Sequence, residues 1–157
     1  MSQVSHASAT NQRLDAARRL LQQSQMEQAQ WLVGSLESSA VYQLRSAVNG
    51  LLQEIKQGYR LKADQLTIEQ LQQAAATAEQ SIPVLNELSQ QLSQPQSWLR
   101  QLFERYDTQF ECRQSPVQTA TPAQLIGKGS DGGASTKFIL DALVELVLRY
   151  REDASEY

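Results

Sequence analysis

Cysteine and histidine are nearly absent from this sequence, which contains one of each, Cys112 and His6. A zinc site of the usual kind needs several such ligands, and a Ser–His–Asp or Cys–His nucleophile needs a positioned histidine. A lone cysteine cannot form an internal disulfide, which is typical of proteins from reducing compartments. We therefore expect no catalytic residue, no metal site and no cofactor.

Long hydrophobic runs and an excess of positive charge are missing as well. No apolar run approaches the ~20 residues that a membrane-spanning helix needs, and residues 1–10 lack the apolar centre of a signal peptide. The net charge of −3 gives no general attraction to nucleic acid or to anionic lipid. The one dense basic cluster, Arg13, Arg18 and Arg19, is typical of a solvated helix turn. We expect a soluble, cytoplasmic protein that avoids membranes, and nucleic acid is a disfavoured partner.

Glycine and proline are also scarce, with 7 and 4 occurrences, whereas glutamine occurs 24 times. Glutamine is a good helix former, and glycine and proline are poor ones. The length of 157 residues suits one domain with one core. These features predict a single all-α domain over residues 1–157.

Apolar residues at spacings of three and four predict an up-and-down bundle of about five helices. The first runs from an N-cap at Thr10 to about Gln25, and the second covers residues 27–59. A third begins after Asp64 or Thr67, and Pro83 either kinks it or begins another helix. Ser97 and Ser135 are expected to cap the remaining two, the last of which ends near Arg151. Residues 1–9 are expected to be disordered, and residues 152–157 to form an acidic tail.

One carboxylate interrupts the apolar stripe of the second helix. Glu37 falls on the line of Val48 and Ile55, where an unpaired charge would be costly to bury. Either the helix breaks near Gly34, or Glu37 has a cationic partner such as Arg13 or Arg18. The break is favoured, because glycine and serine are weak helix residues.

Residues 113–134 differ from the rest in holding two prolines, four glycines and few large apolar residues. They are expected to form one long flexible loop before the last helix. Residues 127–132 match the pattern G-x-G-x-x-G, but no strand precedes them, as the dinucleotide fingerprint requires. A flexible linker is favoured, and phosphate or nucleotide binding by the Gly-rich loop 127–133 is the alternative.

The last helix is apolar around most of its circumference, so it must be surrounded. It is either the centre of the bundle or the interface of a homodimer, which is slightly favoured. Asp141, Glu145 and Arg149 form its narrow polar stripe, with Glu145 placed to pair with Arg149. The candidate self-association face comprises Phe138, Ile139, Leu143, Leu146, Val147 and Tyr150.

A second candidate site lies on the second helix, where Tyr42, Arg45 and Asn49 share an edge. They could form a small polar recognition patch, although a solvated edge is the favoured interpretation. Trp31 and Trp98 could form a ligand-stacking pocket, but such residues more often fill a helical core.

Three stretches, residues 10–14 (TNQRL), 42–61 (YQLRSAVNGLLQEIKQGYRL) and 95–99 (PQSWL), resemble an uncharacterised family of short α-helical proteobacterial proteins, pseudomonad in type. The resemblance covers roughly the first 110 residues and implies a domain of unknown function. Residues 40–58 are more weakly similar to HEPN-type bundles, some of which cleave RNA. Those nucleases place an Arg shortly before a His, and no Arg precedes His6, so this resemblance implies a non-catalytic member.

Together these features indicate a non-enzymatic binding or assembly module that acts through contacts with a protein partner. The alternatives are a nucleotide- or phosphate-binding protein that uses the Gly-rich loop, and a non-catalytic HEPN-like bundle associated with RNA.

We expect a strongly helical circular-dichroism spectrum and one cooperative thermal transition that EDTA does not shift, because no ligand cluster for a metal is present. A spectrum dominated by sheet, or a melting temperature that chelator lowers by several degrees, would contradict this expectation.

Overall fold

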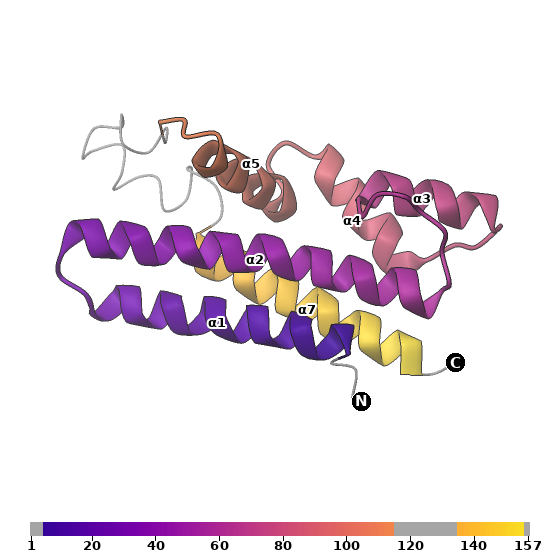
Figure 1. Cartoon of the computed structure of the whole chain (residues 1–157), viewed down its shortest axis with the longest axis horizontal. Coiled ribbons are helices and arrows are strands. Elements are labelled where there is room, and N and C mark those ends of the chain that lie inside the picture. Colours follow the sequence, from indigo (N-terminus) through magenta and orange to yellow (C-terminus); the bar gives the residue numbers. More distant parts are fainter. Residues whose placement is uncertain (1–4, 115–134, 156–157) are drawn as a thin grey trace.

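The computed structural model describes residues 5–114 and 135–155, which form six α-helices and no strand. The helices are α1 (His6–Met26), α2 (Gln30–Gly58), α3 (Ile68–Thr77), α4 (Pro83–Ser93), α5 (Trp98–Phe110) and α7 (Thr136–Ser155). The long helices α1, α2 and α7 lie side by side, and the shorter α3, α4 and α5 pack across α2 and α7 (Figure 1). The all-α prediction is confirmed. The helix count exceeds five because Pro83 begins α4 rather than kinking α3.

Side-chain caps set most of the helix starts. Thr67, Ser97 and Ser135 each accept a hydrogen bond from the backbone N–H three residues later, at 3.1 Å, as expected. The predicted N-cap of α1 at Thr10 is wrong, because Ser5 caps this helix in the same way and residues 6–9 are helical. α7 likewise continues beyond Arg151 to Ser155, since Glu152 and Asp153 are exposed and lose no hydration in a helix.

The middle of the expected long loop, residues 115–134, lies outside the described residues, and so does the Gly-rich loop 127–133. The described start of that stretch ends α5: Cys112 has a left-handed φ of 56°, and the Arg113 N–H donates to the Thr108 carbonyl at 2.8 Å. This turn stops α5 well before it would reach the beginning of α2.

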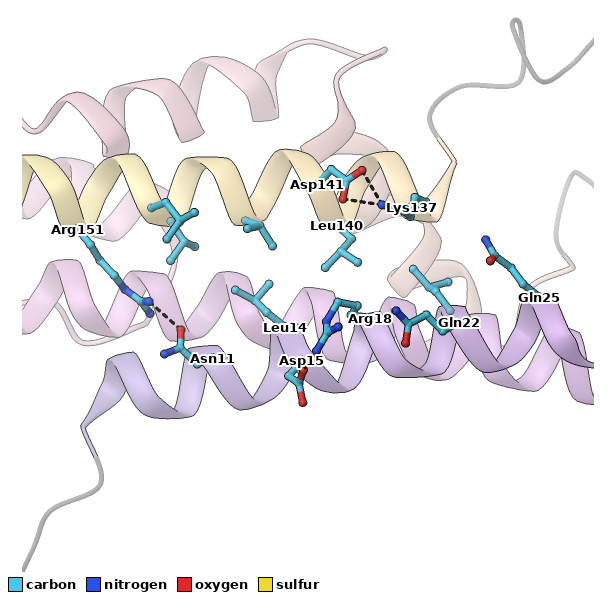
Figure 2. Close-up of a pocket in the computed structure, with 14 residues that line it drawn as sticks. Asn11, Leu14, Asp15, Arg18, Gln22, Gln25, Lys137, Leu140, Asp141 and Arg151 are labelled. Atoms are coloured by element: carbon cyan, nitrogen blue, oxygen red, sulfur yellow. Dashed lines mark hydrogen bonds and ion pairs between the residues drawn. The ribbon is translucent and has the colours of Figure 1, made fainter.

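A buried ion pair fastens α1, α2 and α7 together. The carboxylate of Glu54, with a side chain 9% exposed, accepts from Arg151 Nε at 3.1 Å and from Nη2 at 3.2 Å. Arg151 also donates to Asn11 Oδ1 at 2.7 Å (Figure 2), and Thr10 Oγ1 lies 2.8 Å from Glu54 Oε2. α1 approaches α2 closely here, because Gly50 has no side chain to hold Thr10 away.

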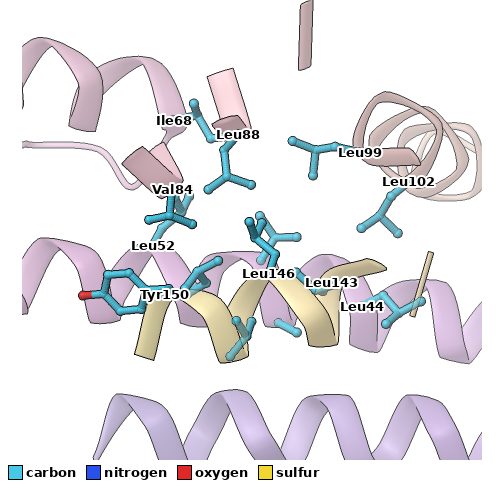
Figure 3. Close-up of a cluster of buried hydrophobic side chains, with 14 of the residues drawn as sticks. Leu44, Leu52, Ile68, Val84, Leu88, Leu99, Leu102, Leu143, Leu146 and Tyr150 are labelled. Carbon is cyan, nitrogen blue, oxygen red and sulfur yellow. The ribbon is translucent and has the colours of Figure 1, made fainter. Parts of the chain in front are cut away.

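The apolar core surrounds the second half of α2. Leu44 and Leu52 of α2 meet Leu143 and Leu146 of α7 (Figure 3). The shorter helices cover the opposite side of this cluster with Ile68 of α3, Val84 and Leu88 of α4, and Leu99 and Leu102 of α5. Burial of these side chains on both sides of α2 supplies the main driving force for the fold.

The first third of α2 is different, because none of residues 30–39 is buried. With the end of α1, it forms a hairpin that extends beyond α5 and α7 (Figure 1). The predicted break near Gly34 is therefore wrong, since α2 is continuous from Gln30 to Gly58. Glu37 is exposed, and its charge opposes the lowering of the pKa of Arg105 of α5 that burial causes. The carboxylate of Glu37 therefore stays in water at little cost.

Two glycines of α2 give a matched test of this packing. A Cβ at Gly50 would lie 2.4 Å from Thr10 Oγ1, whereas a Cβ at Gly34 would have no neighbour within 4 Å. Gly50→Ala should lower the free energy of unfolding by about 1–3 kcal/mol through overpacking. Gly34→Ala should raise it by about 0.5–1 kcal/mol through helix propensity. Urea titration of both variants measures this, and equal effects would show that α1 is not held against Gly50.

Candidate interaction surface

The predicted self-association face of α7 is largely part of the core. Ile139, Leu143, Leu146, Val147 and Tyr150 are buried within the bundle, and Phe138 alone of the six is exposed. These five side chains therefore lie where the bundle-centre alternative predicted, packed against α2 and the shorter helices. The polar stripe is as expected, since Arg149 Nε lies 3.8 Å from Glu145, and its Nη1 also donates to Glu87 of α4 at 2.9 Å.

Burial also changes the acidity of Tyr150. Desolvation, assisted by the charges of Tyr59 and Glu54, raises the pKa of its hydroxyl to about 12. The hydroxyl donates to the Glu54 carbonyl at 3.2 Å. Tyr150 is thus held as a neutral donor at the end of the bundle and is unsuited to proton transfer near neutral pH.

A groove of about 410 Å³ runs between α1 and α7 (Figure 2). Its apolar lining comprises Leu14, Leu21, Leu140, Val144, Val147 and Leu148. The charged groups at its rim already have partners in the chain, because Arg18 pairs with Asp15 and Lys137 with Asp141. Apart from the amide side chains of Gln22 and Gln25, the groove therefore offers a ligand mainly apolar contact.

The described part of the chain holds no group of three or more His, Cys, Asp or Glu side chains that could bind a metal ion. In the same residues, none of the helices combines the length and the apolar character needed to cross a membrane.

The predicted polar patch lies where α5 crosses α2. Arg45 Nη1 donates to Asn49 Oδ1 at 2.9 Å, and the Arg45 guanidinium carbon lies 3.8 Å from the centre of the Phe103 ring. Burial lowers the pKa of Arg45, while the neighbouring Asp107 and Tyr106 oppose that shift. Arg45 remains a cation at neutral pH, enclosed by aromatic rings. The patch is a solvated edge only in part, because Arg45 and Asn49 are half-buried and Tyr42 is exposed.

Aromatic rings continue from this arginine toward solvent. Tyr106 lies 6.3 Å from Tyr42 and stacks on Phe110 with ring centres 5.9 Å apart. Tyr42 is 51% exposed and Phe110 is 77% exposed. Phe103, Tyr106 and Phe110 recur on α5 at spacings of three and four residues, but this spacing alone does not show that the ring of Phe110 stays in water.

Trp31 lies farther along the same side of α2. Trp31, Ser35, Ser38 and Tyr42 follow one another at spacings of four, three and four residues, so they share one face of the helix. The prediction that both tryptophans fill the core is wrong for Trp31, which is 74% exposed on the projecting hairpin. It is right for Trp98, which packs against the core.

The end of α5 closes one side of this face, because Gln109 Nε2 donates to the Ser38 carbonyl at 3.0 Å. We call the exposed area formed by Trp31, Ser35, Ser38, Tyr42 and Phe110 the α2–α5 surface. It joins two segments that lie far apart in the sequence.

Comparison with known protein families gives a match that covers the whole chain. Residues 1–157 match the family of unknown function DUF6586. The chain belongs to this family. The match extends past the roughly 110 residues on which the sequence resemblance rested, and DUF6586 carries no assigned activity. No curated protein and no solved structure matches this DUF6586 member, so its function has to be argued from the surface itself.

Arg45 and Arg100 allow a test of the enclosed cation. Arg45→Ala should lower the free energy of unfolding by about 1–2 kcal/mol, because it removes the stacked guanidinium and the stem that covers Phe103. Arg100→Ala, which removes an exposed i,i+4 partner of Glu104 on α5, should change it by less than about 0.5 kcal/mol. Thermal unfolding of both variants checks this, and a similar loss for both would argue against a special role for Arg45.

Proposed function

We propose that this protein is a non-enzymatic binding module that contacts a protein partner through the α2–α5 surface. The observation that carries the proposal is the exposure of three aromatic side chains, Trp31, Tyr42 and Phe110, on adjoining parts of α2 and α5. Monomeric soluble proteins rarely expose such grouped apolar area without an interaction to cover it. Tryptophan and tyrosine are also enriched where binding energy concentrates.

Two of the three exposed rings, those of Tyr42 and Phe110, are held by their neighbours before any partner arrives. Phe110 stacks on Tyr106, Tyr106 contacts Tyr42, and Arg45 lies over both Phe103 and Tyr106. Side chains already fixed by their neighbours lose little conformational entropy on binding. This arrangement suits recognition by rigid aromatic anchors.

The chemistry of the surface favours an apolar or neutral protein partner over nucleic acid or phosphate. None of its five residues is charged, and the nearby Arg45 is enclosed by Phe103 and Tyr106 rather than directed at solvent. Phosphate binding by residues 127–133 and an RNA-associated HEPN-like role remain predictions from the sequence. The proposal includes a cytoplasmic setting in a bacterium, supported by the single cysteine and by the motifs in residues 10–14, 42–61 and 95–99.

A pair of double variants tests the proposed function. Proteins captured by the wild type from the native cell would be identified, purified and titrated against Trp31→Ala/Phe110→Ala and against Phe138→Ala/Leu148→Ala. The second pair removes exposed apolar side chains from α7. The first pair should weaken the affinity at least tenfold, as loss of aromatic anchors does, and the second should leave it unchanged. Equal affinity for both double variants would exclude the α2–α5 surface.

A further inference from the structure

We infer that the partner of the α2–α5 surface is a second copy of this chain, bound across a two-fold axis that passes near Ser35. This inference rests on the proposed function and names the occupant of the same surface. It moves the homodimer contact from α7, where five of the six candidate side chains are buried, to the projecting part of α2.

The surface is complementary to itself. Trp31 and Tyr42 are eleven residues apart on one helix face, or about 16 Å along the axis. Two α2 helices that cross antiparallel at Ser35 bring Trp31 of each copy beside Ser39 of the other. Ser39 of that other copy adjoins the end of its own α5, because Gln109 of that copy donates a hydrogen bond to its own Ser38 carbonyl. Phe110 is the residue that follows Gln109. Each exposed tryptophan then meets an exposed phenylalanine, and the contact occurs twice, as a two-fold axis requires.

The absence of charge at the four crossing positions favours a second copy. Near a two-fold axis every residue lies close to its own equivalent, so an ionised side chain there would meet a like charge. Trp31, Ser35, Ser38 and Tyr42 are all neutral. Glu37 is displaced from Ser35 by ~200° around the helix, because each residue turns the helix by ~100°. Its carboxylate therefore points away from the crossing.

The described helices leave the proposed crossing open. The hairpin of α1 and α2 extends beyond the end of α5 (Figure 1), and Trp31 and Ser35 are exposed there, so no described helix lies over them. Two of the three aromatic side chains are about three-quarters exposed and the third is half exposed. Rings of about 150–250 Å² each, together with the helix surface between them, approach the roughly 800 Å² per partner of a standard interface.

Charge reversal at the axis gives the sharpest test. Ser35 is exposed, so Ser35→Arg and Ser35→Glu should both fold, which circular dichroism verifies. Light scattering during size-exclusion chromatography should show a wild-type dimer and two monomeric variants, because like charges meet at the axis. Mixing the two variants should restore a dimer that contains one copy of each, since residue 35 then faces its opposite charge. Gln57→Arg, at the exposed far end of α2, should remain dimeric.

The outcomes separate this inference from the proposed function. A wild-type chain that is monomeric at micromolar concentration overturns the inference, and the proposed function survives if a different protein still depends on Trp31 and Phe110. A dimer that persists in Ser35→Arg and in Trp31→Ala/Phe110→Ala uses another face, which overturns the inference as well. A dimer that forms again only when the Ser35→Arg and Ser35→Glu variants are mixed supports both the inference and the proposed function.

Discussion

The ion pair between Glu54 and Arg151 is the constraint on which the arrangement of the long helices depends. It joins the beginning of α1, the end of α2 and the end of α7, and Thr10 and Asn11 complete its hydrogen bonds. A carboxylate so far removed from water is tolerated only when it is fully paired. The pair therefore fixes where α1 lies along α2, since a shift by one turn would leave Glu54 without Thr10 and Arg151 without Asn11.

That register explains why part of the molecule projects. The ion pair holds the beginning of α1 beside the end of α2. The other ends of these two helices extend past α7, which begins at Thr136, and past α5, which ends at Phe110 (Figure 1). Apolar residues of α2 are buried from Ala40 onward, whereas none of residues 30–39 is buried. Within the described residues, no helix covers the face of α2 that carries the exposed Trp31 and Ser35.

The proposed function depends on what this projection exposes. The core and its buried ion pair hold the bundle together, and the rings around Arg45 form a stiff junction between α2 and α5. Beside that junction, Tyr42, Phe110 and Trp31 are exposed, and none of the five residues of the α2–α5 surface is charged. This exposed aromatic surface offers apolar contact to a partner, and the proposed binding role rests on it.

The sequence by itself determined the local structure of this protein. Helical spacing, the caps at Thr67, Ser97 and Ser135, and the start of α4 at Pro83 all depend on neighbouring residues along the chain. Glu54 also lies at a core position of α2, between Leu51 and Gly58. The helical spacing of these residues could therefore have predicted a buried carboxylate. Only the tertiary structure decided which stripes are covered: it buried the apolar face of α7, left Glu37 and Trp31 in water, and brought Phe110 beside Tyr42. Burial depends on which helices lie over a residue, and that depends on contacts between segments distant in sequence, which no local pattern records.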